Sequence, residues 1–404
     1  MNSPSLTVGG DFLYEGVRIE KMEKKIVVAK RVFKDILALK DESDLYGEMK
    51  AIRFFFVSMV LLTAVCVAHE RPHQSKVKYT PPTEPIVIGQ GDWRYQLVPS
   101  WGLGAESKIE VGHCHAMVQS KSGLVYLANT HPKNSIVVFT TKGELVDAWG
   151  DFLPSAHGLS IVEEGGEEFL FITDNSRGGK IVKTTLKGEV VMQINCPMES
   201  GLYESPQEFR PSRTIILPNG DLIVLDGYGK DYVLRFDAHG KYLSAFGGDL
   251  GTGEAKLEHY GPHGGNIDIA NPARPELILA LSDKQRMKRF STDGTWLETI
   301  HLPGSNPRDV LFHRDHIIVP HLGDDWPGDK DAAGYISVLS RDFKVVANLG
   351  GKPPVYHDGK LQPMTHDTHA FLHPHGILFD QEGNLYVAQF DSNQTLPLKF
   401  KPLR

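Results

Sequence analysis

The 404-residue sequence predicts an all-β protein, a six-bladed β-propeller. The first observation behind this prediction is composition: 40 glycines and 25 prolines favour many tight turns over long helices. The second is a repeat. From about residue 85 onward, short apolar runs alternate with polar glycine turns, and the pattern returns every 40–55 residues or so, a period typical of propeller blades.

Each repeat has the same internal order of strands and turns. A glycine turn joins its first two strands, as at Ser122-Gly123, Asn219-Gly220 and Glu382-Gly383, and an apolar strand follows each time. Four-strand units begin near residues 113, 155, 210, 261, 306 and 372. A β-sandwich with a second small domain fits this regularity less well. The propeller is therefore expected to span residues 85–404, and we expect the extended segment 86–101 to add the outer strand of the last blade.

The N-terminal region predicts a targeting segment ahead of the propeller. Lys50 and Arg53 precede an apolar run, 54–68, that is followed by polar residues, as in a secretory signal peptide. The run is short for a membrane span, which needs about 20 apolar residues. The hypothesis is that Met49 is the true start, with residues 1–48 either an over-extended reading of the gene or a dispensable leader. A signal peptide over 49–68 and a linker over 69–90 follow. A retained signal anchor, the only expected link to a membrane, is the alternative.

Charge and cysteine content restrict the functions to consider. The net charge of −7 and the lack of a basic stripe argue against nucleic acid as a partner. A secreted or periplasmic protein that acts as a monomer is expected. Only Cys114 and Cys196 remain after a cleavage at residue 68, too few for a disulfide scaffold, and their spacing leaves open whether they pair.

Histidines recur where the innermost strand of each blade begins. Blades 2, 4 and 6 begin with a His-Gly pair, at His157, His263 and His375. Because innermost strands line the channel, these side chains should converge from alternate blades, about 120° apart. Three imidazoles with an open position suit a catalytic Zn²⁺ or a similar divalent ion. The alternative is that they are polar lining of a crowded channel.

Other side chains are expected beside these histidines. His115 holds the entry position of blade 1 and is a candidate fourth ligand. Arg308 holds that of blade 5, where it would either orient a carboxylate or pair with Asp309 or another acid. Tyr228 ends a strand of blade 3 and is either a base beside the metal or a packing residue at a turn. Four more histidines are expected near the same mouth, each more typical of a loop than of a ligand: His113, His366, His369 and His373.

These motifs resemble those of the peptidyl-α-hydroxyglycine α-amidating lyases, six-bladed propellers of the NHL-repeat kind. The resemblance covers roughly residues 95–400. It rests on the His-Gly-Leu-Ser run from His157, the Asp-Gly-Tyr run ending at Tyr228, and the Pro-His pairs at His263 and His375. It implies zinc held by the three histidines, Tyr228 as the base, and a structural calcium bound partly through the backbone carbonyl of Leu159.

The sequence also departs from the family. The family has an aspartate where this chain has Gly376, a methionine where it has His373, and an essential blade 1 arginine where it reads Thr-His-Pro-Lys over 130–133. Arg308 and Arg213 are the candidates to replace that arginine.

Two functions follow as hypotheses. The first is a metal-dependent lyase or hydrolase acting on a small molecule or peptide. In its lyase form, zinc polarises an α-hydroxyl, Tyr228 accepts a proton, and a C–N bond breaks to give an amide and glyoxylate. The alternative is a non-catalytic propeller that binds a protein or glycan. The polar blade 5 excursion over 320–334 would then be a binding surface, although it also fits a lid or a solvated loop.

Overall fold

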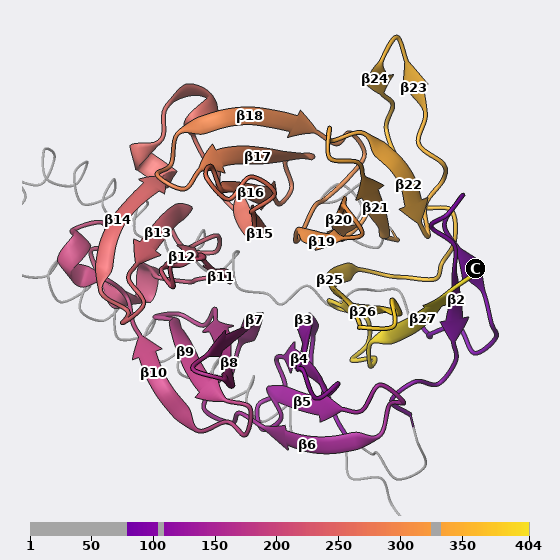
Figure 1. Ribbon diagram of the computed structural model, residues 1–404, viewed down its shortest axis with the longest axis horizontal. Helices are drawn as coiled ribbons and strands as arrows, with labels where there is room; N and C mark the ends of the chain where they lie inside the picture. The colour runs from indigo at the N-terminus through magenta and orange to yellow at the C-terminus, as the bar shows by residue number, and fades with distance from the viewer. Residues whose placement is uncertain (1–78, 104–108, 325–332, 404) are drawn as a thin grey trace, which may run out of the picture. The chain divides into compact units, whose positions relative to one another are not determined.

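The computed structural model describes residues 79–103, 109–324 and 333–403. These residues form six antiparallel sheets arranged around a central axis (Figure 1), which confirms the predicted six-bladed propeller. The expected leader, the signal peptide and most of the linker lie outside the described residues. No helix within the described ranges is long and apolar enough to cross a membrane.

The first three blades each contain four strands in chain order. Blade 1 consists of β3 (Cys114–Gln119), β4 (Val125–Asn129), β5 (Ile136–Phe139) and β6 (Leu145–Trp149). Blade 2 consists of β7 (Ala156–Glu164), β8 (Glu167–Asp174), β9 (Lys180–Thr185) and β10 (Val190–Ile194). Blade 3 consists of β11 (Arg213–Ile216), β12 (Leu222–Leu225), β13 (Tyr232–Phe236) and β14 (Tyr242–Gly247).

The next two blades repeat this order, and the last one differs. Blade 4 consists of β15 (Pro262–Asp268), β16 (Glu276–Leu281), β17 (Arg286–Ser291) and β18 (Trp296–His301). Blade 5 consists of β19 (Leu311–His313), β20 (His316–His321), β21 (Tyr335–Leu339) and β22 (Val345–Leu349). Blade 6 consists of β25 (Pro374–Phe379), β26 (Leu385–Gln389), β27 (Leu398–Pro402), β2 (Tyr95–Val98) and β1 (Val87–Ile88).

Blade 6 closes the ring with strands from the two ends of the described chain. Strand β2 pairs with β27 in antiparallel register, with Tyr95 opposite Pro402 and Val98 opposite Lys399. Figure 1 shows β2 beside β27 at the edge of the propeller. This pairing confirms that the 86–101 segment supplies outer strands of the last blade.

Short elements complete the fold outside the blades. A two-stranded hairpin, β23 (Tyr356–His357) with β24 (Lys360–Leu361), projects from the ring between blades 5 and 6 (Figure 1). Four 3₁₀ turns lie in the connections after blades 2 and 3: η1 (Met198–Ser200), η2 (Pro206–Glu208), η3 (Gly248–Leu250) and η4 (Gly253–Ala255).

The hydrophobic core is divided among the six junctions between neighbouring blades. Ala128 and Val138 of blade 1, for example, pack with Leu170 and Val182 of blade 2 in one buried cluster. Five further clusters join the other neighbouring pairs. Because each blade buries apolar side chains on both faces, the inner strands are held rigidly and their first residues have fixed positions around the axis.

Candidate functional site

The entry positions of the six innermost strands form a ring of side chains at one mouth of the channel. Each of the six lies within three residues of the start of an innermost strand, and we call them the entry ring. In blade order they are His115, His157, Ser212, His263, Arg308 and His375. Five of them are at most 5% exposed and Arg308 is 7% exposed.

The three alternate-blade histidines form a nearly equilateral triangle. The ring centroids of His157 and His263 are 4.9 Å apart, those of His157 and His375 are 4.8 Å apart, and those of His263 and His375 are 4.9 Å apart. This geometry agrees with the expected 120° relation. The imidazoles face one another across the axis.

Each of these imidazoles is oriented by the backbone of the next blade. His157 Nδ1 lies 2.8 Å from the carbonyl oxygen of Ser212. His263 Nδ1 lies 2.8 Å from the carbonyl oxygen of Arg308, and His375 Nδ1 lies 2.9 Å from that of His115. A carbonyl oxygen only accepts, so Nδ1 carries the hydrogen and Nε2 keeps its lone pair. A partner that fixes the tautomer in this way is a common feature of histidine metal ligands.

Burial keeps the imidazoles neutral. It lowers the pKa of His157 to about 3, although the Ser212 carbonyl favours the charged form. Burial and the charge of Arg308 lower the pKa of His263 well below its ordinary value. The pKa of His375 is also lowered well below its usual range, by burial and by the neighbouring histidines. Neutral imidazoles with a lone pair on Nε2 are the form that binds a metal ion.

The glycine after each of these histidines allows the carbonyl contact. A Cβ on Gly158 would lie 2.7 Å from the Ser212 oxygen. A Cβ on Gly264 would lie 2.1 Å from the carbonyl oxygen of Arg308, and one on Gly376 would lie 2.1 Å from that of His115. The strands are therefore packed as closely as expected if the histidines only lined a crowded channel. The same close packing orients the three imidazoles.

His115 joins the ring in a different way. Its imidazole lies between those of His157 and His375, with centroid distances of 4.4 and 4.5 Å. Its Nδ1 is 3.3 Å from Nε2 of His375. Ligand atoms of His115, His157 and His375 all lie within 4.8 Å of one another, so among the described residues the set whose ligand atoms come together contains His115 and not His263. His115 is therefore a candidate ligand on an equal footing with His263.

Tyr228 reaches the same point from blade 3. Its hydroxyl lies 2.9 Å from Nε2 of His263 and 3.3 Å from Nε2 of His157. Because Nε2 has the lone pair, the phenol donates to it. Burial raises the pKa of Tyr228, whereas the charges of Arg308 and Arg210 lower it. A dication bound by these imidazoles would lower this pKa further.

The guanidinium of Arg308 is a buried cation in the ring, and it has few hydrogen-bond or ion-pair partners among the described residues. Its Nε has no hydrogen-bond partner among the described residues. The acid that it approaches is Asp283, with Nη2 3.8 Å from Oδ1, beyond hydrogen-bond distance. Asp309, the acid first considered for it, lies 3.6 Å from Arg213 instead. The guanidinium therefore keeps donors available for an anion.

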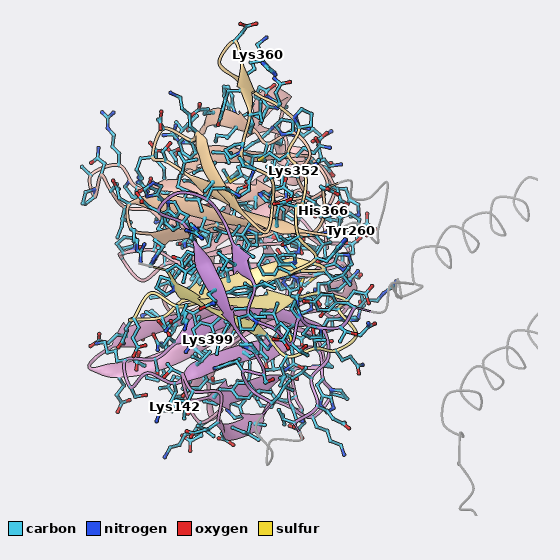
Figure 2. All side chains as sticks on the ribbon, turned by 90° about the vertical axis from the view of Figure 1, so that its right-hand side faces the viewer. Lys142, Tyr260, Lys352, Lys360, His366 and Lys399 are labelled. Carbon is cyan, nitrogen blue, oxygen red and sulfur yellow. The ribbon has the colours of Figure 1, made fainter. Side chains whose placement is uncertain are left out.

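The remaining predicted histidines lie in two places. His113 accepts a hydrogen bond from the backbone of Asp391, and His373 Nδ1 faces the carbonyl of Phe390. The other two, His366 and His369, pack together with His366 Nδ1 2.6 Å from Asp324. Figure 2 shows His366 toward the same face of the propeller as Tyr260. Tyr260 lies three residues before His263, the entry residue of blade 4.

The sequence places Ser212 at the blade 3 entry position but indicates neither its role nor the positions of Arg210 and Phe390. Ser212 supplies a carbonyl, and a backbone contact has no side-chain signature. Arg210 places its guanidinium 5.8 Å from the Tyr228 ring, and Phe390 lies 5.8 Å from the His115 ring. Both are in loops whose approach to the axis depends on the folded connection.

The resemblance implies a zinc ion and a calcium ion, and the residues of the site fit zinc but not calcium. Three neutral imidazoles with oriented Nε2 atoms fit zinc. The carbonyl of Leu159, two residues along the strand from His157, accepts a hydrogen bond from Nη1 of Arg213 at 2.9 Å. That oxygen is already bonded to a cationic side chain, so the residues around it do not fit a calcium ion while Arg213 is in place.

Comparison with known proteins agrees with the repeat pattern. Over 213 residues, the chain is 26% identical to mouse NHL repeat-containing protein 3, a match that covers 50% of this chain and 58% of the relative. The chain resembles an NHL-repeat protein. The match thus spans little more than half of the relative's length. No protein-family model matches the chain.

Similar solved structures are propellers of low sequence identity. One is a streptogramin B lyase structure, 15% identical, which matches 73% of this chain and 95% of its own with a TM-score of 0.48. Another is a catalytically inactive H270A virginiamycin B lyase from Staphylococcus aureus with quinupristin, 13% identical over 82% and 98% of the two chains, with a TM-score of 0.47. These likenesses concern the fold and carry no assignment of a reaction.

Proposed function

We propose that the protein is a zinc-dependent lyase that breaks the C–N bond of an N-acyl-α-hydroxyglycine or a related small α-hydroxy carboxylate. The observation that carries the proposal is the near-equilateral triangle of His157, His263 and His375, whose imidazoles all turn Nε2 away from a backbone carbonyl. A zinc ion bound there would act as a Lewis acid on the substrate hydroxyl.

Tyr228 is the proposed general base. Its oxygen is within hydrogen-bond distance of Nε2 of both His157 and His263, so a substrate hydroxyl bound at the triangle would be close to it. The phenolate accepts the hydroxyl proton, the O–H electrons form the carbonyl, and the C–N bond breaks. The departing nitrogen takes up this proton from Tyr228, which restores the phenolate and gives a carboxamide and glyoxylate. Burial raises the pKa of Tyr228, and the charges of Arg308 and Arg210 offset part of that rise.

Arg308 is the proposed partner of the substrate carboxylate. It enters the ring from blade 5, is 7% exposed, and has a buried Nε without a partner among the described residues. A buried guanidinium costs free energy unless an anion pairs with it, and its planar fork fits a carboxylate. The charge of Arg308 acts on Tyr228 and lowers its pKa, so a carboxylate bound to Arg308 would lie in the neighbourhood of the proposed base.

Elemental analysis and product detection test the proposal together. Protein purified without chelator should carry about one zinc per chain, and it should release glyoxylate from an N-acyl-α-hydroxyglycine. Replacement of His157, His263 and His375 by alanine should remove both properties. A matched control changes three exposed histidines, His239, His301 and His357, and should change neither.

Each failure has a distinct meaning. Zinc without glyoxylate release would refute the lyase reaction and leave the metal centre. Metal content that is unchanged in the triple variant would refute the ligand assignment. If no transition metal is present, the histidines line the channel, and the non-catalytic binding propeller becomes the better account.

A further inference from the structure

The channel has a second level directly beneath the entry ring. We define it as the residue that follows each entry residue, at Ala116, Gly158, Arg213, Gly264, Asp309 and Gly376. The three glycines belong to the blades that carry the triangle histidines. The opposite charges of Arg213 and Asp309 enter this level from blades 3 and 5.

The Arg213 guanidinium ties three blades together. Its side chain is 15% exposed. Nη1 donates to the carbonyl oxygen of Leu159 in blade 2 at 2.9 Å, and Nη2 lies 3.6 Å from Oδ2 of Asp309 in blade 5. Arg213 of blade 3 therefore contacts both a backbone carbonyl of blade 2 and a carboxylate of blade 5, and these two blades lie on opposite sides of the axis.

Asp309 is held in place for this contact. Its Oδ1 accepts hydrogen bonds from the backbone N–H groups of Val310, at 2.9 Å, and Gly265, at 3.2 Å. Its other oxygen, Oδ2, faces Arg213, and the side chain is 16% exposed. Since both carboxylate oxygens have assigned partners, the group has a fixed direction toward the axis.

Few oxygen ligands remain for a different cation at this level. Blade 6 offers no carboxylate, because a Cβ on Gly376 would lie 2.1 Å from the backbone oxygen of His115. A cavity of about 500 Å³ adjoins this level, and Ala116 and Gly376 of the level line it. Arg213 and Asp309 line its inner end, whereas none of the four entry-ring histidines does. The remaining walls come from all six blades: Met117, Ile161, Thr214, Asn266, Leu311 and Ile377.

We propose that the Arg213 guanidinium is the built-in cation of the second level, and that the propeller therefore folds without a calcium ion in its channel. Carbonyl and carboxylate oxygens are the ligands that calcium prefers. Here the Leu159 carbonyl and Asp309 face a planar cation that supplies several N–H donors from the chain itself. This inference is independent of the zinc triangle in the level above.

Thermal unfolding with separate add-back of metals tests the proposal. Wild-type protein stripped with a chelator should show no change in Tm on addition of millimolar calcium. Zinc is added back in a parallel sample, because the chelator also removes a transition metal from the histidines. Arg213→Ala should lower Tm by about 3–8 °C, and calcium should restore much of that loss, since the oxygens of Leu159 and Asp309 are then left without a cation.

Two further variants locate the effect. Arg213→Ala combined with Asp309→Asn should lose the calcium response. Arg235→Ala removes another arginine of blade 3 that pairs with an aspartate, Asp221 at 2.5 Å, and should create no calcium response. If Arg213→Ala does not fold, Arg213→Lys retains the charge and should unfold at a Tm that is insensitive to calcium. The proposal is overturned if calcium alone raises the Tm of the stripped wild-type protein, or if the double variant still responds.

Discussion

Gly376 and His115 are in contact across the junction between blades 6 and 1. A Cβ added to Gly376 would lie 2.1 Å from the backbone carbonyl oxygen of His115. The same oxygen accepts the hydrogen bond of His375 Nδ1 at 2.9 Å. The glycine and the orientation of the preceding histidine are therefore parts of one arrangement, repeated in blades 2 and 4.

Gly376→Ala should therefore damage stability and metal binding together. The added methyl group must push the two backbones apart, which strains the packing and lengthens the His375 hydrogen bond. We expect a loss of about 2–4 kcal/mol in the free energy of unfolding, measured in urea, and about 10–100-fold weaker zinc binding, measured by competition with a chelator.

Gly158→Ala provides a graded comparison for this prediction. Its Cβ would lie 2.7 Å from the Ser212 oxygen, so the backbone shift is smaller. We expect the same two effects in weaker form. Equal zinc affinity in wild type and Gly376→Ala would show that the carbonyl contact serves packing alone.

Removal of the Tyr228 hydroxyl should separate catalysis from metal binding. Tyr228→Phe retains the ring, which packs edge-on against His157 and His263, but it loses the hydrogen bond to Nε2 of His263. We expect an unchanged zinc content and glyoxylate release that is slower by about 10²–10⁴-fold, as for loss of a general base. Full activity in this variant would assign the proton transfer to another group.

The fold was predictable because the propeller repeats a local pattern. The glycine turns at Gly123, Gly220 and Gly383 all have positive φ, between 82° and 87°, which is why glycine marks the same turn in different blades. The apolar strands after these turns form the buried junctions. Strand β2 was predictable by elimination, since the 86–101 segment has no unit of its own.

The candidate site was only partly predictable. His157, His263 and His375 were found because each begins a repeat, so their mutual geometry follows from the symmetry. The partners of Arg213 and Arg308 could not be predicted from the sequence. Arg308 and Asp309 are adjacent in sequence, yet successive residues of an extended chain point in different directions, and Asp309 approaches Arg213 across the channel.

Arg308 should determine recognition of the substrate carboxylate. Arg308→Met should lower kcat/KM by about 10²–10³-fold for an α-hydroxyglycine with a free carboxylate, because the guanidinium–carboxylate pair is lost. The same substitution should have a much smaller effect on the corresponding neutral amide. Steady-state kinetics with the two substrates measures the difference.

Asp283→Asn is the control for the structural interpretation of Arg308. Asp283 Oδ1 lies 3.8 Å from the guanidinium and also accepts a hydrogen bond from Asn306 Nδ2 at 2.7 Å. If Arg308 serves chiefly as a partner of this acid, Asp283→Asn should reproduce the kinetic loss for both substrates. We expect it to leave the preference for the carboxylate intact.

His321 should contribute to acid unfolding of the propeller. It is fully buried in β20, its Nε2 bonds to Ser337 Oγ at 2.9 Å, and burial lowers its pKa to about 3. In the unfolded chain, the same imidazole titrates near 6.5. Between these two values the unfolded state binds more protons, so the stability that neutral His321 contributes above pH 6.5 is lost as the pH falls toward 3.

His321→Gln should remove this part of the pH dependence. Gln also has a donor for Ser337 but does not titrate, so the variant should be less stable than wild type at pH 7, and the difference should shrink by an amount on the order of 4 kcal/mol as the pH approaches 3. Urea unfolding of both proteins across this range measures the difference. The other buried histidines contribute equally to both proteins and cancel in it. Parallel stability curves would mean that His321 is protonated in the folded state or that the unfolded state also shields it.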